Sequence, residues 1–192
     1  LQAGKEILPT PEEIPVCIND ILNPRFSYAA SKIMGEAAVV AYARKYNFPA
    51  TIVRYHNIYG PRMGYEHVIP ELSLRILARE KQFKLYGSEP TRAFCFVSDA
   101  VEATIKALEY AHLDSVEIFH IGNDNEEIKI KKLLNFMFEV SDYKPDQVEY
   151  LEAPSGSPER RCPDISKLRD CLSFSPKVDL KSGLKQTFGT SA

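Results

Sequence analysis

The feature that most constrains the fold is a long helical segment followed directly by a β-branched strand. Residues 27–46 are rich in alanine and in other residues of high helix propensity, so they predict a helix. The tripeptide at 47–49 (NFP) ends that helix, and residues 50–56 (ATIVRYH) are typical of a buried parallel strand. Helices and short strands alternate along the rest of the chain, which predicts an α/β protein.

The later segments continue this alternation. Helices are expected near 68–80, from Ser98-Asp99 as an N-cap pair to about 111, over 129–140, from about 164 and over 180–188. Strands are expected over 83–86, 93–97, 116–121 and 148–153, and residues 1–26 are expected to be loop. The β-branched runs are too few for a complete doubly wound sheet. The helix at 27–46 is apolar nearly all round, which predicts contact with more than one neighbour.

Composition narrows the classes of partner. The formal net charge is −2, so no polybasic field favours nucleic acid or an anionic membrane surface. No apolar run approaches the roughly 18 residues of a membrane span. The four cysteines are far apart and lack the spacing of metal ligands, so we expect no metal site but reduced thiols in a cytoplasmic protein: Cys17, Cys95, Cys162 and Cys171.

One pair of side chains has the spacing of an acid–base site. Tyr28 and Lys32 are four residues apart on the expected helix and therefore lie on one face. A lysine cation one turn from a phenol favours the phenolate, which can take a proton from a substrate hydroxyl. The chain has ten tyrosines, so such spacing also arises by chance, and the surrounding sequence must decide.

The surrounding sequence resembles the extended short-chain dehydrogenase/reductases, the NAD-dependent epimerase/dehydratase family. Residues 24–36 (PRFSYAASKIMGE) are similar to the family's active-site helix, in which Tyr-x-x-x-Lys is followed by Glu. Residues 54–61 (RYHNIYGP) are similar to the family's Arg-x-x-Asn-x-Tyr-Gly-Pro segment. Three more blocks follow in family order: 85–100 (LYG, then RAFCFVSDA), 119–123 (FHIGN, for Tyr-Asn-Ile-Gly), and 160–167 (RRCPDISK) with Gly183-Leu184.

The resemblance implies roles around the cofactor. Tyr28 would be the catalytic base, and Lys32 would also hold the nicotinamide ribose. The backbone near Tyr55 and His56 would line the nicotinamide side. The cofactor would be NAD or NADP.

The resemblance also implies a set of substrate contacts. Asn57 would hydrogen-bond the substrate diphosphate, although an asparagine in a turn can serve only as a cap. Arg92 would pair with the phosphates, unless it is a solvated surface arginine. Arg160 or Arg161 would add a second phosphate contact, and the choice between the two stays open.

Two departures qualify the resemblance. Ala93 stands where the family has aspartate after Arg92, which removes a polar partner of that arginine. No Gly-x-x-Gly-x-x-Gly occurs among the nine glycines, and the family's active-site Ser or Thr is expected to precede Leu1. The implied fold is the C-terminal part of a Rossmann-like doubly wound parallel sheet with its N-terminal half missing, plus a small α/β substrate-binding domain. Residues 1–61 would belong to the first part and 62–192 mainly to the second, with segments that return to the sheet.

The implied parent is an NAD-dependent nucleotide-sugar epimerase that oxidises a sugar hydroxyl transiently to a ketone. A decarboxylase or a 4,6-dehydratase of the same family is the alternative, and so is a non-catalytic binding or scaffold protein if the chain is complete. Most cofactor contacts would come from the missing half, so this chain alone is expected to be inactive and to bind NAD weakly. The helix at 27–46 is expected to form a homodimer contact, and neither nucleic acid nor a membrane is an expected partner.

Overall fold

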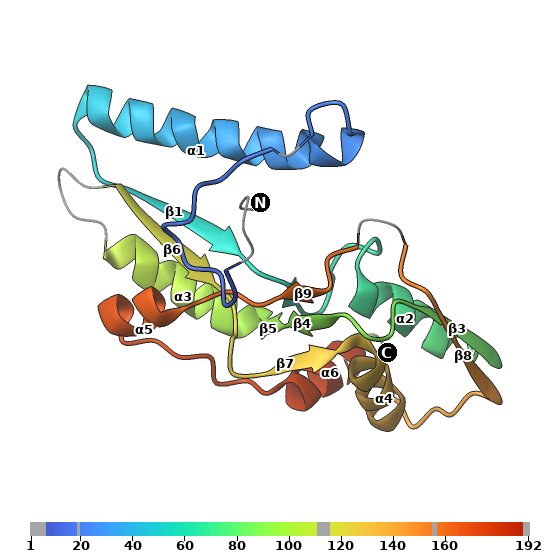
Figure 1. The fold of residues 1–192 in the computed structure, drawn as a ribbon. Coiled ribbons are helices and arrows are strands. Elements are labelled where there is room, and N and C mark those ends of the chain that lie inside the picture. The colour runs from blue at the N-terminus through green and yellow to red at the C-terminus, as the bar shows by residue number, and fades with distance from the viewer. Residues whose placement is uncertain (1–6, 19, 111–115, 155–156, 190–192) are drawn as a thin grey trace.

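The computed structural model describes residues 7–18, 20–110, 116–154 and 157–189 (Figure 1). A short 3-10 turn, η1 (Pro24–Phe26), leads into helix α1 (Ser27–Tyr46), which has the bounds that the sequence predicts. Asn47 ends α1 in the left-handed conformation, with φ 52°, and its N–H caps the helix by bonding the Ala43 carbonyl. Strand β1 (Ala50–Tyr55) follows after two more residues.

A segment far along the chain returns beside β1. Strand β6 (Val116–Ile121) pairs with β1 in parallel from Ala50↔Val116 to Tyr55↔Ile121. Helix α1 lies over one face of this pair, and α3 (Val97–Glu109) lies over the other (Figure 1). Helix α5 (Ser166–Leu172) packs beside α3 and β6. This layered α/β arrangement agrees with the predicted class.

The other half of the molecule is built from short strands. Strand β3 (Gln82–Tyr86) pairs in parallel with β8 (Gln147–Leu151). Strand β4 (Thr91–Ala93) lies between antiparallel β7 (Glu127–Lys129) and parallel β9 (Arg160–Arg161). Strand β2 (Ile58–Tyr59) pairs with β5 (Cys95–Phe96). Helices complete this half: α2 (Val68–Leu77), α4 (Ile130–Val140) and α6 (Leu180–Gly189).

The apolar core divides into two clusters. One lies between β6, α3 and α5 and includes Ala103, Phe119 and Leu168. The other joins β3 to helices α2, α4 and α6 and includes Phe83 and Leu133. The first cluster supports the β1–β6 pair, and the second supports the short strands that carry the arginines.

The expected N-cap role of Asp99 is wrong. Helix α3 begins at Val97, so Asp99 lies in its first turn and does not cap it. The buried Asp99 carboxylate instead accepts the backbone N–H groups of Lys177 (3.1 Å) and Val178 (3.0 Å), because these donors would otherwise lack partners where the chain passes α3. In α1 only Ala43 is buried within this chain, so the expected contact of this helix with more than one neighbour stays a prediction.

Within the described ranges, every helix is too short or too polar to cross a bilayer.

Candidate active site

The tyrosine and lysine singled out from the sequence lie at the N-terminal end of α1. Tyr28 is 71% exposed, and Lys32 is exposed as well. The Lys32 ammonium nitrogen lies 5.1 Å from the centre of the Tyr28 ring. The two groups are therefore close together and open to a ligand on the surface of the helix.

Arg54 of β1 connects the sheet to α1. Its Nε donates to Glu36 Oε1 (2.8 Å) and its Nη2 donates to Glu36 Oε2 (2.7 Å), a bidentate pair. Its remaining terminal nitrogen donates to the Glu12 backbone carbonyl at 3.0 Å. This guanidinium therefore joins the active-site helix, the strand and the N-terminal segment.

The end of β1 presents different groups on its two faces. The Tyr55 hydroxyl lies 2.9 Å from the Thr104 hydroxyl of α3, so its side chain is on the face away from α1 and only its backbone can line the other side. The His56 ring lies against His120, with ring centres 4.5 Å apart. The buried His56 Nε2 has no hydrogen-bond partner among the described residues. Burial, and then the neighbouring His120, lower the pKa of His56 to about 3, so this ring is neutral at pH 7.

Asn57 occupies the turn after β1 in the left-handed conformation, with φ 45°. Its side-chain amide nitrogen donates to the Ala93 carbonyl at 2.9 Å, and its backbone carbonyl accepts the Cys95 N–H at 3.2 Å. Asparagine tolerates this backbone conformation better than most residues. Since a side-chain NH₂ has two hydrogens, the second can still donate to a ligand.

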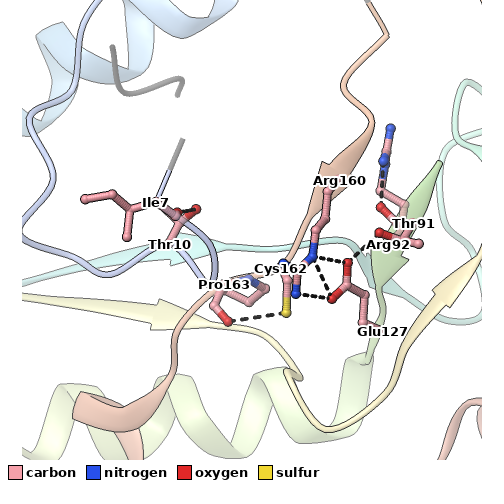
Figure 2. Close-up of polar contacts among 8 residues, drawn as sticks. All are labelled: Ile7, Thr10, Thr91, Arg92, Glu127, Arg160, Cys162 and Pro163. Atoms are coloured by element: carbon pink, nitrogen blue, oxygen red, sulfur yellow. Dashed lines mark hydrogen bonds and ion pairs between the residues drawn. The ribbon is translucent and has the colours of Figure 1, made fainter. Parts of the chain in front are cut away.

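The strand register separates the two neighbouring arginines of β9. Arg92 is the partner of Arg161 in the β4–β9 pair, and Thr91 is the partner of Arg160, so Arg92 and Arg161 share one face. Arg160 forms a bidentate pair with Glu127 of β7 at 2.7–3.0 Å, and Thr91 also bonds that carboxylate. Figure 2 shows Arg160 beside Glu127, with the Arg92 side chain running in another direction. Arg160 is therefore held in an ion pair, while Arg161 shares the face of Arg92.

The two backbone carbonyls that accept hydrogen bonds from Arg92 do not neutralise its charge. This half-buried guanidinium donates to two neutral backbone carbonyls, Thr91 (2.7 Å) and Pro158 (2.9 Å). Burial, and then the neighbouring Arg161 cation, lower the pKa of Arg92. Two cations on one face, one of them partly desolvated, make a site that an anion would stabilise.

An open pocket of about 500 Å³ adjoins the ends of these strands. Its lining comes from the turn before β4, the end of β8 and the segment before β9: Gly87, Ser88, Glu89, Pro90, Leu151, Glu152, Ala153, Pro154, Ser157 and Glu159. Sequence reasoning did not find this pocket, because its residues are ordinary loop residues that the fold brings together.

Comparison with known proteins identifies the family. Residues 3–122, more than half of the chain, match the model of the NAD dependent epimerase/dehydratase family. The chain belongs to this family. A UDP-N-acetyl-alpha-D-glucosaminuronate decarboxylase of Bacillus cytotoxicus is 35% identical over 173 residues, which cover 85% of this chain and 52% of that protein. UDP-D-apiose/UDP-D-xylose synthase 2 of Arabidopsis thaliana is 29% identical and covers 97% of this chain and 54% of its own length.

Solved structures agree with this assignment. The UDP-glucose 4-epimerase of Thermotoga maritima, determined with UDP-glucose, superimposes with a TM-score of 0.82 at 30% identity, over 98% of this chain and 58% of that one. A Bacillus cereus UDP-glucuronic acid 4-epimerase, determined with UDP-glucuronic acid and NAD, gives a TM-score of 0.75 at 28% identity, over 84% and 51%. The chain thus spans about half the length of the relatives it matches, and the expected partial Rossmann-like fold is confirmed.

Proposed function

We propose that the protein is an NAD-dependent nucleotide-sugar epimerase that oxidises a sugar hydroxyl transiently to a ketone. The observation that carries the proposal is the exposed pair of Tyr28 and Lys32 at the start of α1. The Tyr28 phenolate takes the proton of the sugar hydroxyl and returns it when the ketone is reduced. The Lys32 ammonium, 5.1 Å from the centre of that ring, can donate to the cofactor ribose.

The described residues fit the nicotinamide side of the cofactor. Tyr28 and Lys32 are open to it, and the Tyr55 backbone and the His56 side chain lie at the end of the adjacent strand. The unpartnered His56 Nε2 is a buried polar atom that a bound group can satisfy. NAD or NADP, when bound, supplies the acceptor and donor of hydride.

The substrate proposal rests on the arginine register. Arg92 and Arg161, on one face of the β4–β9 pair, contact the diphosphate, and Asn57 adds an amide donor. Arg160 is the less suitable phosphate ligand because Glu127 already holds it. The pocket beside these strands is large enough for a nucleoside, and the relatives named above act on or bind UDP-sugars.

The second candidate is a decarboxylase of the same family. It is favoured by the 35% identity to the Bacillus cytotoxicus decarboxylase and by 32% identity over 163 residues to UDP-glucuronic acid decarboxylase 6 of Arabidopsis thaliana. Both candidates share the oxidation at Tyr28. Incubation of the full-length protein with NAD and UDP-glucuronic acid separates them, because only the decarboxylase releases carbon dioxide.

The proposal extends to assembly and location. Residues 1–61, with α3, β6 and α5 returning to the sheet, belong to the cofactor-binding part, and the rest of 62–192 forms the substrate-binding part. The exposed α1 face is the contact of a homodimer. The four cysteines form no disulfide among the described residues, which suits the reducing cytoplasm.

Affinity for UDP tests the substrate site on this chain. Arg92→Ala and Arg161→Ala should each weaken UDP binding by about 1.5–3 kcal/mol, since each removes a hydrogen bond to a charged phosphate. Arg160→Ala is the matched control, because it removes the same side chain from the adjacent position, and it should leave UDP affinity within about twofold of wild type. Isothermal titration calorimetry with UDP measures all three. Equal losses for Arg160→Ala and Arg161→Ala would show that the register argument is wrong.

A further inference from the structure

We propose that Arg54 and Glu36 are positioning residues that hold the Tyr28–Lys32 helix in a fixed relation to the arginine-bearing strand β9. This inference rests on the proposed function, because it concerns the geometry of that site. Neither residue needs to touch substrate or cofactor for this role.

Glu36 lies on the face of α1 that is turned toward the rest of the chain. The half-buried and buried side chains of this helix form one stripe that faces the rest of the chain: Ala29, Ala30, Ile33, Glu36, Val40 and Ala43. Glu36 is the charged member of an otherwise apolar stripe, and a half-buried carboxylate requires a partner. Tyr28 and Lys32 flank this stripe, so the angle of the stripe against the sheet sets where the phenol points.

Glu36 is nearer to Tyr28 along the helix than the fully buried Ala43 is. Ala43, the fully buried residue of α1, is fifteen residues from Tyr28, or about 22 Å at 1.5 Å per residue. Glu36 is eight residues away, or about 12 Å. The ion pair with Arg54 is therefore the charged contact between the N-terminal half of the helix and the sheet, and its two side chains are mostly shielded, with exposures of 12% for Arg54 and 17% for Glu36.

A network of hydrogen bonds continues from Arg54 into the N-terminal segment and β6. The guanidinium also donates to the Glu12 carbonyl, and the Glu12 carboxylate accepts the His120 backbone N–H at 2.8 Å. The His120 ring donates from Nδ1 to the Thr10 carbonyl at 3.0 Å. Each of these bonds is made by a half-buried or buried group, so each is costly to lose.

The network ends at the residues that follow β9, the strand of the proposed phosphate site. Thr10 donates its N–H to the Cys162 carbonyl (3.0 Å) and accepts from the Asp164 N–H (2.8 Å), directly after β9. Figure 2 shows Thr10 near Cys162 and Pro163, and Figure 1 shows the N-terminal segment rising from this level to the start of α1. A continuous set of bonds thus joins the helix that bears Tyr28 to the strand that bears Arg161.

Hydrogen exchange of the 192-residue chain tests the network without any reaction. Glu36→Gln and Arg54→Lys remove the bidentate charged pair, so the amides of 27–36 and those of Thr10 and Glu12 should exchange about tenfold faster or more, as expected for loss of a charge-assisted bond. Glu80→Gln is the matched control, because Glu80, which follows α2, makes the same kind of bidentate pair at 2.9 Å with Arg75 of α2. It should leave exchange in 27–36 unchanged. Unchanged exchange in Glu36→Gln overturns the proposal.

Kinetics of the full-length protein with NAD separates positioning from a loss of folded protein. For Glu36→Gln, kcat per UDP-binding site should fall about tenfold or more, with UDP affinity and stoichiometry unchanged, because a displaced phenol slows proton transfer without touching the phosphate site. A merely structural role lowers the number of UDP-binding sites and leaves kcat per site at the wild-type value, which overturns the proposal. If wild type itself turns over no nucleotide-sugar, the proposed function fails, while the exchange experiment still decides the network.

Discussion

Helices α1 and α4 come from one chain but are built for different purposes. Helix α4 has eleven residues and buries four of them: Ile130, Leu133, Leu134 and Met137. Helix α1 has twenty residues and buries only Ala43. Several of its large apolar side chains, among them Met34 at 72% exposure, lie open to solvent. Burial explains the sequence of α4, whereas the sequence of α1 must be explained by what binds to its surface.

The same contrast separates the two kinds of interaction that hold them. Helix α4 is stabilised by packing in the apolar cluster around Phe83 and Leu133. The N-terminal half of α1 contacts the rest of the chain through the Arg54–Glu36 pair and through half-buried side chains such as Ile33. Substitutions in α1 should therefore change chemistry with little effect on stability, and substitutions in α4 should do the opposite.

The largest effect is expected for Tyr28→Phe. A positioned acid–base group contributes about 10²- to 10⁴-fold in rate, so kcat of the full-length enzyme should fall by that order with KM little changed. The free energy of unfolding should not change, because Tyr28 is 71% exposed. Tyr42→Phe, at an exposed tyrosine of the same helix, is the matched control and should keep wild-type kcat. If Tyr28→Phe keeps the wild-type kcat, the proposed chemical role of α1 is wrong, and the contrast with α4 concerns burial alone.

The next effect concerns stability. Leu133→Ala in α4 should lower the free energy of unfolding by about 2–5 kcal/mol, since Leu133 is fully buried and the substitution leaves a cavity. At protein concentrations too low for the proposed α1 dimer contact to form, Met34→Ala in α1 should change it by less than about 0.5 kcal/mol, as at other exposed sites. Urea unfolding of both variants measures this. If Met34→Ala destabilises as much as Leu133→Ala, the surface of α1 is covered in solution, and a concentration-dependent midpoint would identify a second copy as the cover.

The contrast also explains what the sequence could predict. The bounds of α1 agree with the prediction, because alanine-rich propensity and the Asn47 stop are local signals. Strands β2, β4, β7 and β9 were not predicted as they occur, because two or three residues carry too little alternation to be recognised. Asp99 was assigned to a cap because the sequence does not show that residues 177–178 pass beside it.

For the candidate site, residue types were predictable and pairings were not. The blocks around Tyr28, Asn57 and Arg92 identified the family from the sequence, and the family match confirms it. The ion pair of Arg160 is made with Glu127, which lies 33 residues away in the chain. Register across strands is a tertiary property, and no local pattern contains it.

The smallest effect is expected from pH, at the point where His56, directly after β1, packs against His120 of β6. Burial, and then His120, Arg54 and Arg161 in decreasing order, lower the pKa of His56 to about 3, whereas an unfolded chain has a histidine pKa of about 6.5. Burial also lowers the pKa of His120, against the opposing effect of Glu12. Between about pH 6.5 and pH 3 the unfolded state therefore binds more protons than the folded state, so stability is lost as pH falls through this window.

From pH 7 to pH 5, His56 alone should account for about 2 kcal/mol, at 1.36 kcal/mol per pKa unit. Urea unfolding at both pH values should show that His56→Phe loses about that much less stability than wild type, while His67→Phe, at an exposed histidine, should follow wild type. Carboxylates also titrate on acidification. The informative quantity is therefore the difference between wild type and His56→Phe in the stability lost from pH 7 to pH 5. Equal pH dependence in those two proteins would show that the His56 ring accepts a proton without leaving its place beside His120.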